Sequence, residues 1–380
     1  MRTVRDLPVA GSRVLVRADL NVPLEDGRIG DDTRIRAALP TIRYLRDQGA
    51  RVVVCSHLGR PKGRPRPELS LRPVAARLAE LLGEPVAFGD AEGPMRMLEN
   101  LRFDPREEQN DAGFAAELAA NADLYVDDAF GAAHRAHAST VGVARILPSA
   151  AGLLLAAELD AFARLLDDPE RPLVVVIGGA KVADKIGVID RFTGLADAVL
   201  VGGAMAFTFI AARGGAVGAS MHEDAEGQRT ALDAVDRACE RGCELVLPSD
   251  VVAADRFAAD AATRVVPADA VPDGWMGLDI GPETARAYAQ RLAGARTIFW
   301  NGPMGVFELE PFAAGTVAVA RAAAESGGVS VVGGGDSVAA VNAAGVADRI
   351  THVSTGGGAA LELVEGRTLP GVAALEGVPT

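Results

Sequence analysis

The sequence predicts an α/β protein made of two doubly wound parallel-sheet domains. Short apolar runs alternate with longer segments of helical period along the whole chain, which is typical of parallel α/β domains. The length of 380 residues favours two domains over one. The segment Asp-Pro-Glu-Arg-Pro at 168–172 interrupts the pattern and marks a natural junction. We therefore expect one domain over 1–168 and another over 172–366.

In the first domain, four apolar runs are predicted strands, and polar residues of ligand-binding type follow each one. The runs are 13–17, 51–55, 95–99 and 124–126. In open α/β sheets, ligands bind beyond the carboxyl ends of the strands. Basic residues after these strands, with one from a predicted helix at 33–47, would therefore meet at one edge: His57, Arg60, Arg102, His134, Arg135 and Arg34. This pattern favours an anion site, although Asp127 and Asp128 would neutralise part of it.

A predicted amphipathic helix at 152–167 leads to the junction, and strands then alternate with loops again. The predicted strands of the second domain are 173–177, 198–201, 244–247, 297–300, 329–332 and 350–353. We expect the glycine loop after 173–177 to enter a helix that carries Lys181 and Lys185 in its first turns. These two residues and Lys62 are the only lysines, and a flexible ammonium can follow a moving phosphate.

The run Gly333-Gly334-Gly335-Asp336-Ser337 follows a predicted strand and opens a predicted helix. Glycines let the backbone approach an anion, and the N–H groups of a first helical turn point towards it. A turn that uses glycines for packing is the simpler alternative. The Asp-Ser pair and a second glycine cluster at 355–358 favour a phosphate loop. A helix N-terminus stabilises a nearby anion by only ~0.3–1 kcal/mol. Binding of a phosphate therefore also needs cationic side chains from elsewhere in the chain.

Composition excludes several classes of function. The net charge of −13 argues against general binding to nucleic acid or to anionic membranes. No apolar run approaches the ~20 residues that a membrane span needs. Three cysteines make no disulfide framework, which indicates a reducing cytoplasm.

The motifs that remain favour phosphoryl transfer. No Walker loop, dinucleotide fingerprint, serine elbow or His-Glu-x-x-His motif is present. A cationic edge on one domain and glycine loops on the other suit a reaction that depends on positioning and charge neutralisation. Positioning alone can supply ~7–11 kcal/mol of a barrier. A carboxylate or phosphate acceptor is already ionised at neutral pH, so no general base is needed.

With these residues in view, the chain resembles the phosphoglycerate kinases from near residue 4 to about residue 375. Eight segments carry the resemblance together and in order: RADLNVP at 17–23, SHLGRP at 56–61, ENLRF at 99–103, AHRAH at 133–137, GGAKVADK at 178–185, WNGPMGVFE at 300–308, GGGD at 333–336 and STGGG at 354–358.

The resemblance implies reversible transfer between 1,3-bisphosphoglycerate and ADP, giving 3-phosphoglycerate and ATP, with Mg²⁺ as the metal. It also implies two Rossmann-like domains joined by a helical hinge, and a tail at 367–380 that packs back on the first domain. A cytoplasmic monomer with small-molecule partners, and with no nucleic-acid or membrane partner, is expected.

The resemblance also implies roles for individual residues. Those expected to bind phosphoglycerate are Asp19, Leu20, Asn21, Arg34, His57, Leu58, Gly59, Arg60, Arg102 and Arg135. Those expected to bind nucleotide are Lys181, Lys185, Gly277, Asn301, Glu308, Gly334, Gly335, Asp336 and Ser337, with Glu308 on the ribose and Asp336 on the metal. Those expected to stabilise the migrating phosphoryl group are Arg34, Lys181, Gly335 and Gly358, the last at a helix N-terminus.

Small departures from the family pattern occur at four positions. Ser337 and Ala132 stand where threonine is usual, Ala204 replaces a glycine, and Met304 replaces a valine. Two alternatives stay open, a non-catalytic nucleotide-binding relative and a kinase for another carboxylate. The former is expected to have lost Arg34, Lys181, Lys185 or Asp336, and the latter to differ in the basic residues of the first domain.

Overall fold

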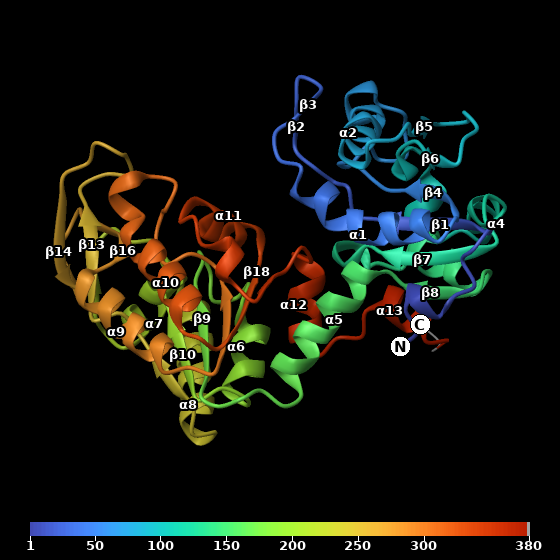
Figure 1. The fold of residues 1–380 in the computed structure, drawn as a ribbon. Coiled ribbons are helices and arrows are strands. Elements are labelled where there is room, and N and C mark those ends of the chain that lie inside the picture. The colour runs from blue at the N-terminus through green and yellow to red at the C-terminus, as the bar shows by residue number, and fades with distance from the viewer. Residues whose placement is uncertain (378–380) are drawn as a thin grey trace. The chain divides into compact units, whose positions relative to one another are not determined.

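Two six-stranded parallel sheets organise the computed structural model, which describes residues 1–377 (Figure 1). The chain separates into two compact units, residues 1–160 with a C-terminal segment beginning at Arg367, and residues 161–366. The division falls inside helix α5 (Leu153–Leu166). Residues 378–380 of the expected tail lie outside the described part. The predicted α/β class with two parallel sheets is confirmed.

The sheet of the first unit has the order β5-β6-β4-β1-β7-β8. Its strands, in chain order, are β1 (Arg13–Ala18), β4 (Arg51–Cys55), β5 (Ala87–Phe88), β6 (Met95–Met97), β7 (Leu124–Asp128) and β8 (Ser149–Ala151). The four apolar runs predicted as strands are β1, β4, β6 and β7. Both faces of β1 are buried, as expected for a parallel strand covered by helices on both sides. The edge strands β5 and β8 were not predicted, because two or three residues leave no apolar run.

The sheet of the second unit has the order β12-β10-β9-β17-β18-β19. Its strands are β9 (Leu173–Ile177), β10 (Ala198–Val201), β12 (Glu244–Val246), β17 (Thr297–Asn301), β18 (Val329–Gly333) and β19 (His352–Val353). All six were predicted. Numbered along the chain, their order is 3-2-1-4-5-6, the doubly wound order in which a ligand crevice opens where the winding reverses. That reversal lies between β9 and β17, where Ile177 pairs with Asn301.

Helices connect the strands of each sheet (Figure 1). Besides α5, the first unit contains α1 (Thr33–Asp47), α2 (Arg72–Leu82), α3 (Pro105–Glu108), α4 (Ala112–Ala119) and α13 (Pro370–Leu375). The second contains α6 (Ile186–Thr193), α7 (Met205–Ala212), α8 (Ala225–Glu240), α9 (Pro282–Ala293), α10 (Ala314–Glu325), α11 (Gly335–Ala343) and α12 (Gly358–Val364). The predicted bounds of α1 are confirmed, and those of α5 differ by one residue at each end. No helix in the described range is long and apolar enough to cross a membrane.

Short helical turns lie in several loops: η1 (Val4–Asp6), η2 (Pro67–Leu69), η3 (Leu101–Phe103), η4 (Phe130–Ala132), η5 (Ala138–Gly142), η6 (Val143–Arg145), η7 (Glu310–Phe312) and η8 (Ala347–Arg349). Three of them, η3, η4 and η5, follow β6 and β7 in the chain. They therefore carry the backbone from those strand ends through the residues of the predicted anion site.

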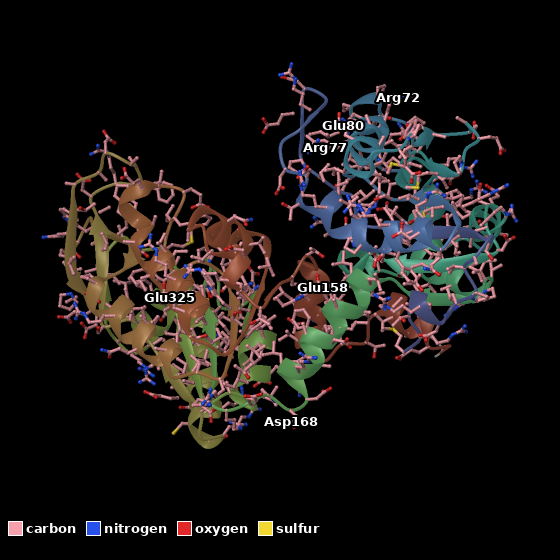
Figure 2. All side chains as sticks on the ribbon, viewed as in Figure 1. Arg72, Arg77, Glu80, Glu158, Asp168 and Glu325 are labelled. Atoms are coloured by element: carbon pink, nitrogen blue, oxygen red, sulfur yellow. The ribbon has the colours of Figure 1, made fainter. Side chains whose placement is uncertain are left out.

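Ion pairs hold α2 against the start of α1. Arg77 of α2 contacts Asp32, the N-cap residue of α1, at 2.8 Å and Glu80 at 2.6 Å. Figure 2 labels Arg77 and Glu80 on α2, close to the hairpin of β2 (Leu24–Glu25) and β3 (Arg28–Ile29). These contacts fix the first turn of α1, which carries Arg34.

A small antiparallel sheet was not predicted. Its order is β14-β13-β16, and the strands are β14 (Thr263–Pro267), β13 (Asp250–Ala254) and β16 (Met276–Ile280). A short parallel pair joins β11 (Ala216–Val217) to β15 (Ala270–Val271), and β15 lies between β14 and β16 in the chain. Strand β14 is mostly exposed, so its sequence needs no continuous apolar run. Strand β16 carries Gly277, which lines a cavity of the second unit.

Candidate functional site

Four arginines of the first unit form what we call the arginine rim: Arg34, Arg60, Arg102 and Arg135. Arg34 comes from α1, Arg60 from the loop after β4, Arg102 from η3, and Arg135 from the loop after η4. His57 lies among them at the carboxyl end of β4 and is only 6% exposed. Burial lowers its pKa well below the usual value, and the charges of Arg17, Arg102, Arg135 and Arg34 lower it further. The charges of three of the four rim arginines therefore lower the pKa of the same imidazole. This agrees with the prediction that these side chains lie close together at one edge of the sheet.

Hydrogen bonds connect the loops that carry the rim. Nη1 of Arg102 donates to the carbonyl of Gly59 at 2.9 Å, and the Gly59 amide donates to Oδ1 of Asn21 at 2.9 Å. The loops after β1 and β4 and the η3 turn thus hold one another. The side chains of Leu20 and Leu58 are buried, and their amides donate to Ser56 and Asn100. These two predicted binding residues therefore have no amide or side-chain surface left for a ligand in this conformation.

Asp19 and Arg34 form an ion pair of 2.5 Å. The side chain of Asp19 is 7% exposed and that of Arg34 is 34% exposed. The carboxylate thus stands behind the guanidinium, and part of Arg34 faces solvent. A carboxylate in this position orients the arginine and leaves other donors of its planar fork available to an anion.

Positive charge exceeds negative charge at the rim. Burial and the neighbouring charge of Arg135 together lower the pKa of Arg102 to about 10, with Glu108 opposing the change. Arg60 is exposed and makes no hydrogen bond or ion pair with any described residue. Arg135 donates from Nε to Nε2 of His134 at 3.1 Å. Cations that repel one another and lack enough acidic partners are stabilised when an anion binds, so the chemistry of the rim suits an anion.

The second unit carries a set of loops that we call the glycine cradle: residues 178–179 after β9, Gly302 after β17, and residues 334–335 after β18. Gly334 has φ +92° and Gly179 has φ +125°, conformations that favour glycine. A Cβ on Gly178 would lie 2.0 Å from the Pro303 carbonyl oxygen, so neighbouring loops approach too closely for a side chain.

Asn301 joins the loops of the glycine cradle. Its Nδ2 donates to the carbonyl of Gly333 at 2.7 Å, and its Oδ1 accepts a hydrogen bond from Nζ of Lys185. The amide of Gly302 donates to Oγ of Ser337 at 2.5 Å. Ser337 therefore keeps a hydroxyl role where the family usually has threonine. These bonds fix the spacing of β17 and β18 at the site.

Two cavities open beside the cradle, and Asp336 lines both. The larger, of about 460 Å³, is mainly apolar and includes Ala204, Gly277, Met304 and Glu308 in its wall. The smaller, of about 260 Å³, is lined by Lys185, Asn301, Gly302, Gly334, Gly335, Asp336, Ser337, Gly357, Gly358 and Leu361. An apolar cavity next to a glycine- and lysine-lined one matches the two parts of a nucleotide, base and phosphates.

Two residues of the larger cavity were missed by the sequence analysis. Phe257 is 62% exposed and Met221 is 61% exposed, and both line this cavity. They belong to no motif of charged or glycine residues. Their only signal in the sequence is an apolar residue in an otherwise polar loop, which is too weak to place them.

The predicted helical position of the two lysines is wrong. Helix α6 begins only at Ile186, with Lys185 as its N-cap residue, so Lys181 lies in the preceding loop. The residues before Ile186 form an isolated turn instead: the amide of Lys185 donates to the carbonyl of Val182, three residues back, at 2.9 Å. Glu223 holds this loop, since its carboxylate accepts from the amides of Val182 at 2.6 Å and Ala183 at 3.4 Å. Lys181 is exposed and makes no hydrogen bond with any described residue. Burial lowers the pKa of Lys185, with Asp336, Asp184 and Glu365 opposing the change.

The glycine cluster at 355–358 lies at the start of α12. Gly357 has φ +50°, and its N–H and that of Gly358 come at the first turn of this helix. Both residues line the smaller cavity with Lys185 and Asp336. The structure therefore brings this second cluster to the same cavity as residues 334–337.

Comparison with known proteins agrees with this geometry. The family model described as phosphoglycerate kinase matches residues 4–367. The chain belongs to the phosphoglycerate kinase family. The phosphoglycerate kinase of Rubrobacter xylanophilus is 59% identical over 98% of both chains, and that of Moorella thermoacetica is 57% identical over the same shares.

Solved structures of the family have the same fold. Phosphoglycerate kinase from Coxiella burnetii has a TM-score of 0.91 and 42% identity, and covers 99% of this chain and 98% of its own. The enzyme from Pyrococcus horikoshii OT3 has a TM-score of 0.82 and 35% identity with the same coverage. A two-domain α/β kinase fold is thus shown for this member of the phosphoglycerate kinase family.

Proposed function

We infer that the chain catalyses the reversible transfer of a phosphoryl group between 1,3-bisphosphoglycerate and ADP, giving 3-phosphoglycerate and ATP in glycolysis. The observation that carries this inference is the presence of two complementary sites in one family member. One is a rim of arginines with excess positive charge, and the other is a glycine cradle beside an apolar cavity.

We assign phosphoglycerate to the arginine rim, in a domain that spans 1–168 and includes the tail from 367. The residues proposed to bind it are Asp19, Asn21, Arg34, His57, Arg60, Arg102 and Arg135, with Leu20, Leu58 and Gly59 shaping the loops between them. Guanidinium groups suit this ligand because their planar forks match carboxylate and phosphate oxygens in two-point hydrogen bonds.

The nucleotide is assigned to the domain at 172–366. The base would occupy the cavity of about 460 Å³, with Gly277 at its wall and Glu308 accepting from the ribose. The phosphates would occupy the smaller cavity, beside Lys181, Lys185, Asn301 and residues 334–337. Glycine N–H groups and lysine ammoniums together supply the partial and full positive charge that polyphosphate needs.

Transfer then requires positioning and charge neutralisation. Arg34, Lys181 and the N–H groups at Gly335 and Gly358 are proposed to stabilise the migrating group, whose charge spreads over three oxygens in the transition state. The acceptor carboxylate or ADP oxygen is already ionised, so the chain needs no general base. We also propose that the two domains close about a helical hinge, which would exclude water from the reacting groups.

Magnesium is proposed to bind at Asp336. This carboxylate is exposed at the start of α11 and lines both cavities, where nucleotide phosphates would supply further oxygens. No cluster of three or more His, Cys, Asp or Glu side chains suited to a metal occurs among residues 1–377. One protein carboxylate with substrate phosphates is the usual Mg²⁺ environment in kinases, and the ion would neutralise phosphate charge there.

A coupled assay tests the function directly. The protein should phosphorylate 3-phosphoglycerate with ATP, and acetate and other short carboxylates should react far more slowly. Equal rates with acetate would favour the kinase for another carboxylate, and ATP binding without turnover would favour a non-catalytic relative. We further propose a cytoplasmic monomer with small-molecule partners, with no nucleic-acid or membrane partner. Light scattering in solution tests the monomer.

A further inference from the structure

Arg17 is a charged residue buried completely inside the first unit. It lies in β1, beside Cys55 of β4 and Asp127 of β7, and its exposure is 0%. Three of its donors have partners: Nε donates to Oγ of Ser139 at 2.8 Å, Nη1 donates to the carbonyl of Ala18 at 2.6 Å, and Nη2 contacts Nδ1 of His57 at 3.0 Å. The proposed roles of rim residues leave Arg17 unexplained.

Arg17 remains charged because a second buried ion compensates it. Glu107 of α3 is 0% exposed, and it accepts from the Ser139 amide at 3.0 Å and from the Ser139 hydroxyl at 2.6 Å. Burial alone would raise the pKa of Glu107. The adjacent imidazole of His137 and the charge of Arg17 outweigh burial, and the pKa lies below its usual value. The chain Glu107–Ser139–Arg17 therefore holds the guanidinium from the side opposite His57.

The contact between Arg17 and His57 determines the protonation of the imidazole. A guanidinium has only donors and accepts no hydrogen bond. Nδ1 of His57 must therefore be the acceptor, so it carries no proton. A neutral imidazole has a single N–H, which must then be on Nε2.

The charges around His57 favour the same neutral form. Arg17 faces it from β1, Arg34 from α1, Arg102 from η3 and Arg135 from the loop after η4. All four are cations, and each makes a positive imidazolium less stable. His57 is 6% exposed, so solvent does little to compensate.

We propose that Arg17 is a positioning residue that locks His57 as a neutral donor with its proton on Nε2, directed to an anionic oxygen of the phosphoglycerate. The second half of this statement rests on the proposed function, whereas the locked tautomer does not. His57 would then recognise its ligand through a fixed N–H and not through a charge. Phosphoglycerate binding should consequently show no pH dependence from this histidine.

Long-range ¹H–¹⁵N NMR spectra of the full chain, labelled at histidine, test the tautomer without any substrate. His57 should show the neutral Nε2–H pattern from about pH 5 to about pH 8. His222 is an internal control of opposite kind, because its Nδ1 lies 2.9 Å from the carbonyl of Ser220 and must carry the proton. A His57 that titrates in this range, or that is protonated on Nδ1, overturns the proposal.

Adding 3-phosphoglycerate to the same sample tests the contact with the ligand. The Nε2–H signal of His57 should shift, while the Nδ1–H signal of His222 should stay in place. An unmoved His57 signal at saturation, with the tautomer as expected, overturns the assignment of His57 as a ligand donor. A protein inactive in the coupled assay but with the expected tautomer would count against the proposed function and not against the lock.

Variants at position 17 give a second measurement. Arg17→Lys keeps a donor next to Nδ1, whereas Arg17→Met removes it, so only the methionine variant should allow the proton of the neutral His57 imidazole to move to Nδ1. The KM for 3-phosphoglycerate should rise roughly 10- to 100-fold in Arg17→Met and less in Arg17→Lys, with the KM for ATP unchanged. A His57 imidazole that keeps its proton fully on Nε2 in Arg17→Met, as in the parent and in Arg17→Lys, would contradict a positioning role. The spectra of the parent protein decide the question if Arg17→Met does not fold.

Discussion

Arg34 donates from Nη1 to Oδ2 of Asp19 at 2.5 Å, and the carboxylate is almost entirely shielded from solvent behind it. The pair joins the first turn of α1 to the loop after β1. It thereby presents a guanidinium whose orientation is set before any ligand arrives. Preorganised charge of this kind is effective in catalysis because it needs no rearrangement in the transition state.

Arg34→Ala should lower kcat by roughly 100-fold or more, because one preorganised donor to the transition state is lost. Nucleotide affinity should stay nearly unchanged, which calorimetric titration with ADP would measure. Arg36→Ala is the matched control, since Arg36 lies on the same helix, is 55% exposed and pairs with Asp32. A large loss of ADP affinity in Arg34→Ala would contradict the assignment of separate binding sites.

Asp336→Ala should weaken the response of the rate to magnesium, raising the concentration needed for half-maximal activity by about tenfold or more. The reason is the loss of the one carboxylate that lines both cavities. Asp184→Ala removes an equal charge near Lys185 and serves as the control. An unchanged magnesium dependence would remove Asp336 from the metal site.

Gly334→Ala should damage the glycine cradle through both strain and contact. Gly334 has φ +92°, and an added Cβ would lie 2.6 Å from Nδ2 of Asn301. We expect a loss of about 1–3 kcal/mol in stability and weaker ADP binding. Gly345→Ala is matched in strain, with φ +67°, but its Cβ would meet no atom within 4 Å. If both variants bind ADP equally well, the contact of the added Cβ with Asn301 does not affect ADP binding.

The parts of the fold that could be predicted are those with a local cause. The strands β9 and β17 are continuous apolar runs, and their loops contain glycine because the backbones approach closely at the winding reversal. The edge strands β5 and β8 and the small sheet around β13 have no such pattern. Their pairing depends on neighbouring strands that are already in place.

The same distinction applies to the site. The sequence motifs led to the rim arginines and to the cradle, because all of these residues except Arg34 follow a strand. The start of α6 was misplaced because the residues before it form a separate loop, which Glu223, about forty positions away in the chain, holds through the amides of Val182 and Ala183. Arg17 was overlooked since its role depends on His57, which lies on a neighbouring strand end. Such long-range partners leave no local signal.

Asp128 should make stability depend on pH. It accepts from the amide of Leu154 at 2.9 Å and from that of Leu155 at 3.3 Å, and burial raises its pKa to about 7. Between the ordinary carboxyl pKa of about 4 and this value, the folded state binds more protons than the unfolded state, so stability falls as pH rises. Asp128→Asn should therefore show a smaller fall in the denaturant midpoint between about pH 4 and pH 7.

Asp123→Asn is a control with the opposite sign. The hydrogen bonds and charge of Arg13 lower the pKa of Asp123, so its contribution to stability is lost as pH falls. Its substitution should flatten the acid side of the profile and leave the fall towards pH 7 in place. A parent protein whose midpoint does not fall as pH rises towards 7 would show that Asp128 is ionised without cost.

Glu223→Ala should loosen the loop that carries Lys181 and Lys185. Glu223 is itself held, since its amide donates to Thr208 at 3.1 Å and its carbonyl accepts from Gln228 at 3.1 Å. Without its carboxylate, the amides of Val182 and Ala183 lose their acceptor, and their hydrogen exchange should become faster. We expect the KM for ATP and ADP to rise about tenfold, with the KM for 3-phosphoglycerate unchanged.

The effect of Glu223 should depend on its acceptor oxygens and not on its charge alone. Glu223→Gln keeps one acceptor oxygen, so it should retain the shorter bond to Val182 and lie between the parent and the alanine variant. Glu226→Ala removes an exposed charge of the same sign three residues further on and should change neither measurement. If exchange at Val182 and Ala183 is as slow in Glu223→Ala as in the parent, another group holds the loop.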